Sequence, residues 1–104
     1  MTQSITIVYC TFGNLENLEK VCTFLLNNKL IACYNAFPIN SCYWWASELQ
    51  NDHEFVAILK TVKSKLDEIN QIIESLHSYE IPCIIHWEVE SNQKYSNWVQ
   101  NQLI

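Results

Sequence analysis

The chain has 104 residues, about the length of one domain, and its 11 acidic residues outnumber six basic ones, so that the net charge is −5 at pH 7. All six basic residues are lysine, and Gly13 is the single glycine. Loops that bind nucleotide phosphates need several glycines, and nucleic-acid binders need a clustered positive face. We therefore expect one domain over residues 1–104, with no nucleic acid among its partners.

The N-terminal residues 1–5 lack the basic and long apolar segments of a signal peptide, and no apolar run reaches the ~18 residues that span a bilayer. Five cysteines form an odd set without a C-x-x-C pair: Cys10, Cys22, Cys33, Cys42 and Cys83. This set fits neither a disulfide framework nor a local zinc or iron–sulfur site. We expect a cytoplasmic protein that makes no membrane contact and whose cysteines are mostly buried free thiols.

The first two predicted elements are a strand and a helix. Residues 4–11 are rich in β-branched and aromatic side chains, which predicts a largely buried strand. Leucines and Cys22 then recur at helical spacing and predict a helix over residues 15–28. Asn14 is a typical residue for the N-cap of that helix.

Two strands are expected next. Residues 30–45 are rich in Ile, Tyr, Phe and Trp and predict a long strand with a bulge or bend at Pro38, because proline cannot donate to a sheet ladder. The polar residues 47–53 predict a turn. Residues 54–61 predict a third strand that forms an antiparallel hairpin with the second.

The last elements are a helix, a strand and a short helix. Ser64 and Asp67 resemble a capping box, and apolar residues at helical spacing predict a helix that ends near His77. A fourth strand is predicted to start at Pro82, and the apolar positions in 95–99 fit a terminal helix. The order β-α-β-β-α-β predicts an α+β, ferredoxin-like split βαβ fold with two helices on one face of an antiparallel sheet.

The second strand carries more aromatic surface than one small core can bury. We expect this surplus to lie in a subunit interface of a homo-oligomer, through Tyr34, Phe37, Tyr43, Trp44 and Trp45.

Four groups of residues follow one another along nearly the whole chain: Ala32 to Asn35 with Pro38, Ser41, Tyr43 and Trp45; Glu54 with Lys60 and Thr61; His77 to Pro82; and Tyr95 with Trp98. In this order they resemble the CutA family of divalent-cation tolerance proteins. The resemblance implies a ferredoxin-like subunit, a homotrimer joined through long edge strands, and a role in the response to metal ions. The chain departs from the family at Ser47, where glycine is usual, and at Trp44, where polar or basic residues are common.

The resemblance also implies two metal-linked residues, Cys10 and His77, and copper or another divalent metal as the ion they bind. Thiolate and imidazole suit copper and zinc. Leu76 stands where some relatives have a second histidine, so a third ligand would come from Tyr79, Glu80 or a neighbouring chain. The alternative interpretation is that Cys10 is a core thiol and that the helix dipole stabilises His77 at a helix end.

A different hypothesis is a trimeric module that binds a small ligand or a signalling partner in a cleft between subunits. The side chains that could line such a cleft are aromatic or charged: Lys60, Tyr79, Glu80, Tyr95 and Trp98. In the simpler alternative, Lys60 forms an ordinary ion pair with Glu54 or Glu80.

Catalysis is the third hypothesis, and the sequence argues against it. Cys10 and His77 could be a nucleophile and a base, but no glycine-built oxyanion loop follows the cysteine. Acylphosphatase chemistry, found on similar folds, needs an arginine, which this chain lacks. We expect no enzyme activity and no organic cofactor.

Overall fold

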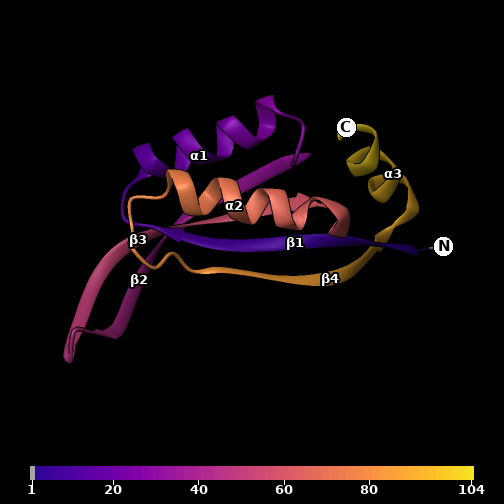
Figure 1. Cartoon of the computed structure of the whole chain (residues 1–104). Helices are drawn as coiled ribbons and strands as arrows, with labels where there is room; N and C mark the ends of the chain where they lie inside the picture. Colours follow the sequence, from indigo (N-terminus) through magenta and orange to yellow (C-terminus); the bar gives the residue numbers. More distant parts are fainter. Residues whose placement is uncertain (1) are drawn as a thin grey trace.

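The computed structural model describes residues 2–104 as a four-stranded antiparallel sheet with three helices. The strands are β1 (Thr2–Phe12), β2 (Cys33–Trp45), β3 (Glu48–Thr61) and β4 (Ile84–Asn92), in the order β2-β3-β1-β4. Helices α1 (Leu15–Asn27) and α2 (Leu66–Leu76) lie on one face of the sheet, and α3 (Gln93–Asn101) lies at one end (Figure 1). This order confirms the predicted ferredoxin-like arrangement. No helix among the described residues is both long and apolar enough to cross a membrane.

The main core lies between the sheet and helices α1 and α2. Alternate residues of β1, among them Val8 and Phe12, point toward the helices, which contribute residues such as Leu18 and Ile69. Each fully buried side chain of this size stabilises the fold by ~1.5–3 kcal/mol relative to an exposed one. A smaller cluster on the opposite face joins β1 to α3 through Ile5, Ile7 and Val99. The two clusters thus pack on both faces of β1.

The two long helices begin in different ways. Asn14 caps α1 as predicted, because its side chain accepts a hydrogen bond from the backbone N–H of Asn17 at 2.7 Å. The predicted capping box at Ser64 is wrong. Ser64 lies inside a 3-10 turn, η1 (Lys63–Lys65), which leads directly into α2 and forms no side-chain cap.

Strands β2 and β3 form one long uninterrupted hairpin. Their pairing runs in constant register from Cys33 opposite Lys60 to Trp45 opposite Glu48. This register shows that the bulge, one of the two features predicted at Pro38, is wrong, whereas the other, a bend, stays a prediction. Because β2 is an edge strand, it tolerates a proline in its ladder. The predicted turn over residues 47–53 is also wrong, since β3 already begins at Glu48.

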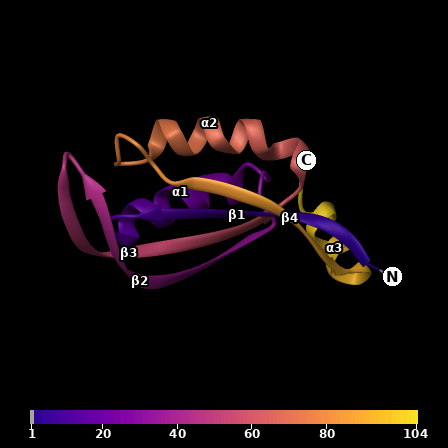
Figure 2. The ribbon, with the colours of Figure 1, turned by 90° about the horizontal axis from the view of Figure 1, so that it is seen from below.

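The connection between the strands is only two residues long, and both have a positive φ: 51° at Ala46 and 64° at Ser47. Two successive left-handed residues are typical of the tight turns that match the twist of a hairpin. The hairpin projects beyond the body of the molecule and bends, as Figure 2 shows, so the molecule is elongated to 47 × 25 × 21 Å. Its outer part has no helix against it, and large apolar side chains there, such as Trp44 and Leu49, are exposed.

The remaining boundaries differ from the predictions by a few residues. Strand β2 starts at Cys33 rather than at residue 30, and β4 starts at Ile84 rather than at Pro82. Residues 77–83 thus form a connection from α2 to β4, which passes the base of the hairpin.

Candidate functional site

Cys10 and His77 both approach the carbonyl oxygen of Thr11 near the end of β1, Cys10 through its Sγ at 3.9 Å and His77 through its Nε2 at 2.7 Å. Cys10 is fully buried in the core, and this desolvation raises the pKa of its thiol well above the usual range. His77 follows directly after α2, and its ring stacks on Phe12 with 4.6 Å between the ring centroids. The histidine is 9% exposed.

Both ring nitrogens of His77 already have hydrogen-bond partners. Nε2 lies 2.7 Å from the carbonyl oxygen of Thr11 and must donate, because a carbonyl only accepts. Nδ1 accepts from the backbone N–H of Tyr79 at 3.0 Å. The ring therefore connects the start of the 77–83 segment to the end of β1, and it has no free lone pair to offer to a metal.

In this conformation, Cys10 and His77 do not fit a bound metal ion. A thiol in the core resists deprotonation, and the imidazole is fully engaged. Across residues 2–104, no group of three or more His, Cys, Asp or Glu side chains is arranged to hold a metal. The role of Cys10 and His77 as copper ligands stays a prediction.

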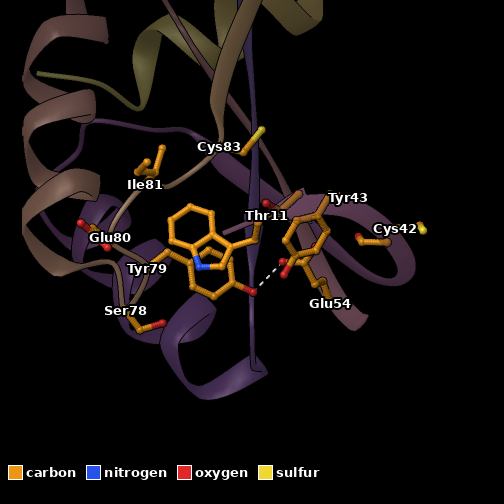
Figure 3. A pocket seen from close by; sticks show the side chains of 11 residues that line it. Thr11, Cys42, Tyr43, Glu54, Ser78, Tyr79, Glu80, Ile81 and Cys83 are labelled. Carbon is orange, nitrogen blue, oxygen red and sulfur yellow. Dashed lines mark hydrogen bonds between the residues drawn. The ribbon is translucent and has the colours of Figure 1, made fainter. Parts of the chain in front are cut away.

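Tyr79 connects the same segment to the base of the hairpin. Its hydroxyl donates to Oε2 of Glu54 at 2.5 Å, and Figure 3 shows the side chain reaching across to that carboxylate. Burial and this hydrogen bond raise the pKa of Tyr79 above its usual range, so the phenol keeps its proton. The ring lies directly over Gly13, where an added Cβ would come within 2.9 Å of the hydroxyl oxygen. The position of Tyr79 therefore favours glycine at residue 13 over a residue with a side chain.

A pocket of about 730 Å³ opens between the hairpin and residues 78–83. Aromatic side chains of Tyr43, Trp45 and Tyr79 line it, together with the carboxylates of Glu54 and Glu80. Tyr43 donates its hydroxyl to Asp52 at 2.5 Å, and that hydrogen bond raises the pKa of Tyr43 to about 12.

The predicted ligand cleft divides into two separate places within one chain. Tyr79 and Glu80 line the pocket, whereas Lys60 lies six residues farther along β3 from Glu54, roughly 20 Å of extended strand. Beside Lys60 are Tyr95 and Trp98, whose rings stack with centroids 5.6 Å apart.

Lys60 does not form the ion pair with Glu54 or Glu80 that the simpler alternative predicts. Its ammonium group donates to Oδ1 of Asn35 at 2.5 Å and lies 5.9 Å from the ring centroid of Tyr95. The correction follows from the register, which places Lys60 opposite Cys33 at the far end of the hairpin from the pocket.

The aromatic residues expected in a subunit interface are mostly exposed. Tyr34 packs against the main core, but Phe37, Trp44 and Trp45 keep 42%, 73% and 45% of their surface in contact with solvent. Ile85 and Trp87 of β4 are also exposed, although they are not among the residues expected in the interface. Their alternation on one face of a strand was the signal that could have identified them.

The sequence and the fold of the chain are similar to those of known proteins. The family described as CutA1 divalent ion tolerance protein matches residues 6–102. A Thermotoga maritima protein named divalent-cation tolerance protein CutA is 40% identical, over 94% of this chain and 98% of that protein. The crystal structure of CutA1 from Pyrococcus horikoshii superposes with a TM-score of 0.92 at 37% identity, covering 95% of this chain and 98% of the other. CutA1 from Oryza sativa gives a TM-score of 0.92 at 33% identity over 99% and 96% of the two chains. This chain therefore belongs to the CutA1 divalent ion tolerance protein family.

Proposed function

We propose that this protein takes part in the cellular response to divalent cations. The observation that carries the proposal is the family match over residues 6–102, together with relatives that are named for tolerance to such ions. The test is growth of a bacterial strain that lacks its own family member, in graded copper, zinc and cadmium. Expression of this chain should raise the tolerated concentration of at least one ion, and unchanged growth in all three would contradict the proposal.

We also propose that the functional unit is a homotrimer. The exposed aromatic side chains of the hairpin support self-association, since such patches seldom remain open to solvent. Both β2 and β4 are edge strands, each with a row of backbone groups available for pairing with another chain.

For copper, we propose weak binding by Cys10 and His77 that requires local rearrangement. A metal ion on His77 would have to replace a hydrogen bond, to Thr11 or to Tyr79, and Cys10 would have to lose its proton in the core. The 77–83 segment is the part of the site that would move, because one of these hydrogen bonds fixes its start.

Calorimetric titration of the reduced protein with Cu(I) and Zn(II), under anaerobic conditions, tests this assignment. Cys10→Ala and His77→Ala should each weaken binding by about tenfold or more. His53→Ala, a change at an exposed histidine of the hairpin, is the matched control and should leave the affinity unchanged. If Cys10→Ala and His77→Ala both bind the metal ions with wild-type affinity, these two residues are not the ligands.

We propose further that the protein is not an enzyme and that it works in the cytoplasm. The raised pKa of the Cys10 thiol is the opposite of what a nucleophilic cysteine needs. Five free cysteines, two of them exposed, are more compatible with a reducing compartment than with an oxidising one.

A further inference from the structure

A thiol and an imidazole lie on the same face of the outer hairpin, on its two neighbouring strands. Cys42 of β2 is opposite Asn51 in the continuous register, and His53 follows two residues after Asn51 on β3. Opposite residues of an antiparallel pair project to the same face, and so do residues two apart on one strand. Cys42 and His53 are therefore diagonal neighbours, with about 7–8 Å between them, a separation that long side chains can span.

This face of the hairpin points away from the pocket. Tyr43 and Trp45 line the pocket, and side chains alternate between the two faces of a strand, so Cys42 projects to the other side. The residue borders the pocket, but Figure 3 shows its sulfur directed away from Tyr43 and Glu54. Cys42 and His53 are both exposed, so that solvent reaches the two donor groups.

The exposed pair differs chemically from the pair at the end of β1. Cys10 is enclosed in the core, and both ring nitrogens of His77 have hydrogen-bond partners. The thiol of Cys42 is open to solvent, so the desolvation that opposes ionisation of a core thiol does not act on it. A metal ion can therefore replace its proton without rearrangement of the fold.

The number and kind of ligands indicate which metal ion suits the pair. Within residues 2–104, no third His, Cys, Asp or Glu side chain completes a cluster that could hold a metal. Zinc in structural sites takes four ligands, whereas a soft thiolate selects Cu(I), which is content with two donors in line. Thiolate and imidazole without further ligands thus favour Cu(I) over Zn(II).

The charge of the hairpin favours a cation as well. Between Lys29 and Lys60 the sequence contains no lysine or arginine, but three carboxylates: Glu48, Asp52 and Glu54. Such a one-sided distribution of charge raises the local concentration of cations.

We propose that Cys42 and His53 together bind one Cu(I) ion per chain, on the face of the hairpin opposite to the pocket. This site is separate from Cys10 and His77 and does not depend on copper binding there. An ion with only two protein ligands at an exposed position stays open to attack by another thiol, so the site suits exchange of copper rather than storage.

The assembly sets one condition for this site. Tyr43 and Trp45, which we expect in the subunit interface, belong to the pocket face, whereas Trp44 projects to the same side as Cys42. The proposal therefore requires that a neighbouring copy leave Cys42 within reach of solvent.

Thiol labelling of the native, reduced protein tests both the site and its access. The full chain is treated with iodoacetamide under anaerobic conditions, and mass spectrometry of its peptides gives the labelling rate of each cysteine. Cys42 should react readily without metal, and one equivalent of Cu(I) per chain should protect it. Cys83, the second exposed cysteine, is the internal control and should stay reactive in the same sample. One equivalent of Zn(II) should protect Cys42 less than Cu(I) does.

The role of His53 is measured in competition with a chromophoric Cu(I) chelator. His53→Ala should weaken the binding of Cu(I) at Cys42 by about tenfold or more, whereas His86→Ala, at an exposed histidine of β4, should leave it unchanged. In the calorimetric titration above, His53→Ala should remove this equivalent of Cu(I) and leave the affinity at Cys10 and His77 as it is.

Four results would each overturn the proposal. The first is a native protein in which Cys42 does not react, which would mean that a neighbouring copy covers it. The others are equal protection of Cys42 and Cys83 by Cu(I), equal protection of Cys42 by Zn(II) and Cu(I), and undiminished protection in His53→Ala. Failure here would leave the role in cation response standing, because that role is tested by growth and not through these two residues.

Discussion

At the scale of single residues, Gly13 and Tyr79 connect the end of β1 to the hairpin. The absence of a Cβ at Gly13 lets the phenol lie over the backbone and reach Glu54. One glycine in a chain of this length is easily dismissed as a loop residue, and nothing in its local sequence predicts this contact. The contact depends on the path of residues 77–83, which brings Tyr79 back over a position 66 residues earlier in the chain.

Gly13→Ala should lower the free energy of unfolding by about 1–3 kcal/mol, because the new methyl group displaces the Tyr79 hydroxyl and leaves Glu54 unpaired. Chemical denaturation of the single variant measures the loss. In a Tyr79→Ala background, Gly13→Ala should lower the free energy of unfolding much less, because the new methyl group no longer meets the tyrosine ring. An equal cost in both backgrounds would show that Gly13 acts through its backbone and not through Tyr79.

Ser47 is in the left-handed region, where glycine has no steric cost. Ser47→Gly should therefore stabilise the protein by ~0.5–1 kcal/mol, with part of the gain offset by the greater freedom of glycine in the unfolded chain. Thermal unfolding at neutral pH measures the effect. A lower midpoint than wild type would mean that the serine side chain has a stabilising contact outside the turn.

The raised pKa of Tyr79 makes stability depend on alkaline pH. In the unfolded chain a tyrosine ionises near pH 10, whereas burial and the bond to Glu54 hold the proton in the folded state. The contribution is fully present below pH 10 and decreases as the pH rises beyond it. The free energy of unfolding should thus fall between pH 10 and 11, and Tyr79→Phe should make the fall shallower. If the free energy of unfolding of Tyr79→Phe falls with pH as steeply as that of the wild type, Tyr79 is not the group responsible.

At the scale of elements, the parts that bury a face were predictable, and so was the pairing of β2 with β3, but the outer part of β3 was not. Helices α1 and α2 show a clear apolar stripe because each packs on the sheet, and β1 is apolar for the same reason. Residues 48–53 of β3 are almost all exposed, so they carry no burial pattern from which a strand could be recognised. The outer pairs continue the register of the inner pairs, and a two-residue turn without a glycine closes the hairpin.

The candidate site, like the fold, was predictable from the sequence only in part. Sequence analysis placed Cys10 and His77 at element ends that could meet, and the structure brings these ends together. It did not predict that the His77 ring would be held by Thr11 and Tyr79, because those contacts depend on the irregular 77–83 segment. Lys60 and Tyr79, expected in one cleft between subunits, lie at opposite ends of the hairpin within a single chain, so their grouping stays a prediction about the assembly.

The exposed rings of the hairpin give a prediction at this scale. Trp45→Ala should raise the dissociation constant of the assembly by about tenfold or more, because large aromatic side chains dominate interface energies. Phe24→Ala on α1 is the matched control, with 44% exposure against 45% for Trp45. Sedimentation at several concentrations measures both. An equal effect of the two changes would place the interface elsewhere.

At the scale of the whole molecule, the acidic pocket and the lysine with its neighbouring aromatic rings lie at opposite ends. The hairpin end carries Glu54 and the acidic pocket, and the other end carries Lys60 beside the stacked rings of Tyr95 and Trp98. Ends of opposite character suit contacts between unlike surfaces of identical chains, which close into rings. In such a ring the two halves of the predicted cleft would come from neighbouring copies.

The mass of the native protein in solution tests this central claim most directly. Light scattering at low micromolar concentration and moderate salt should give three times the chain mass of 12.2 kDa. A stable mass of 12.2 kDa under the same conditions would show that the exposed hairpin and the two open sheet edges do not assemble, and would contradict the trimer.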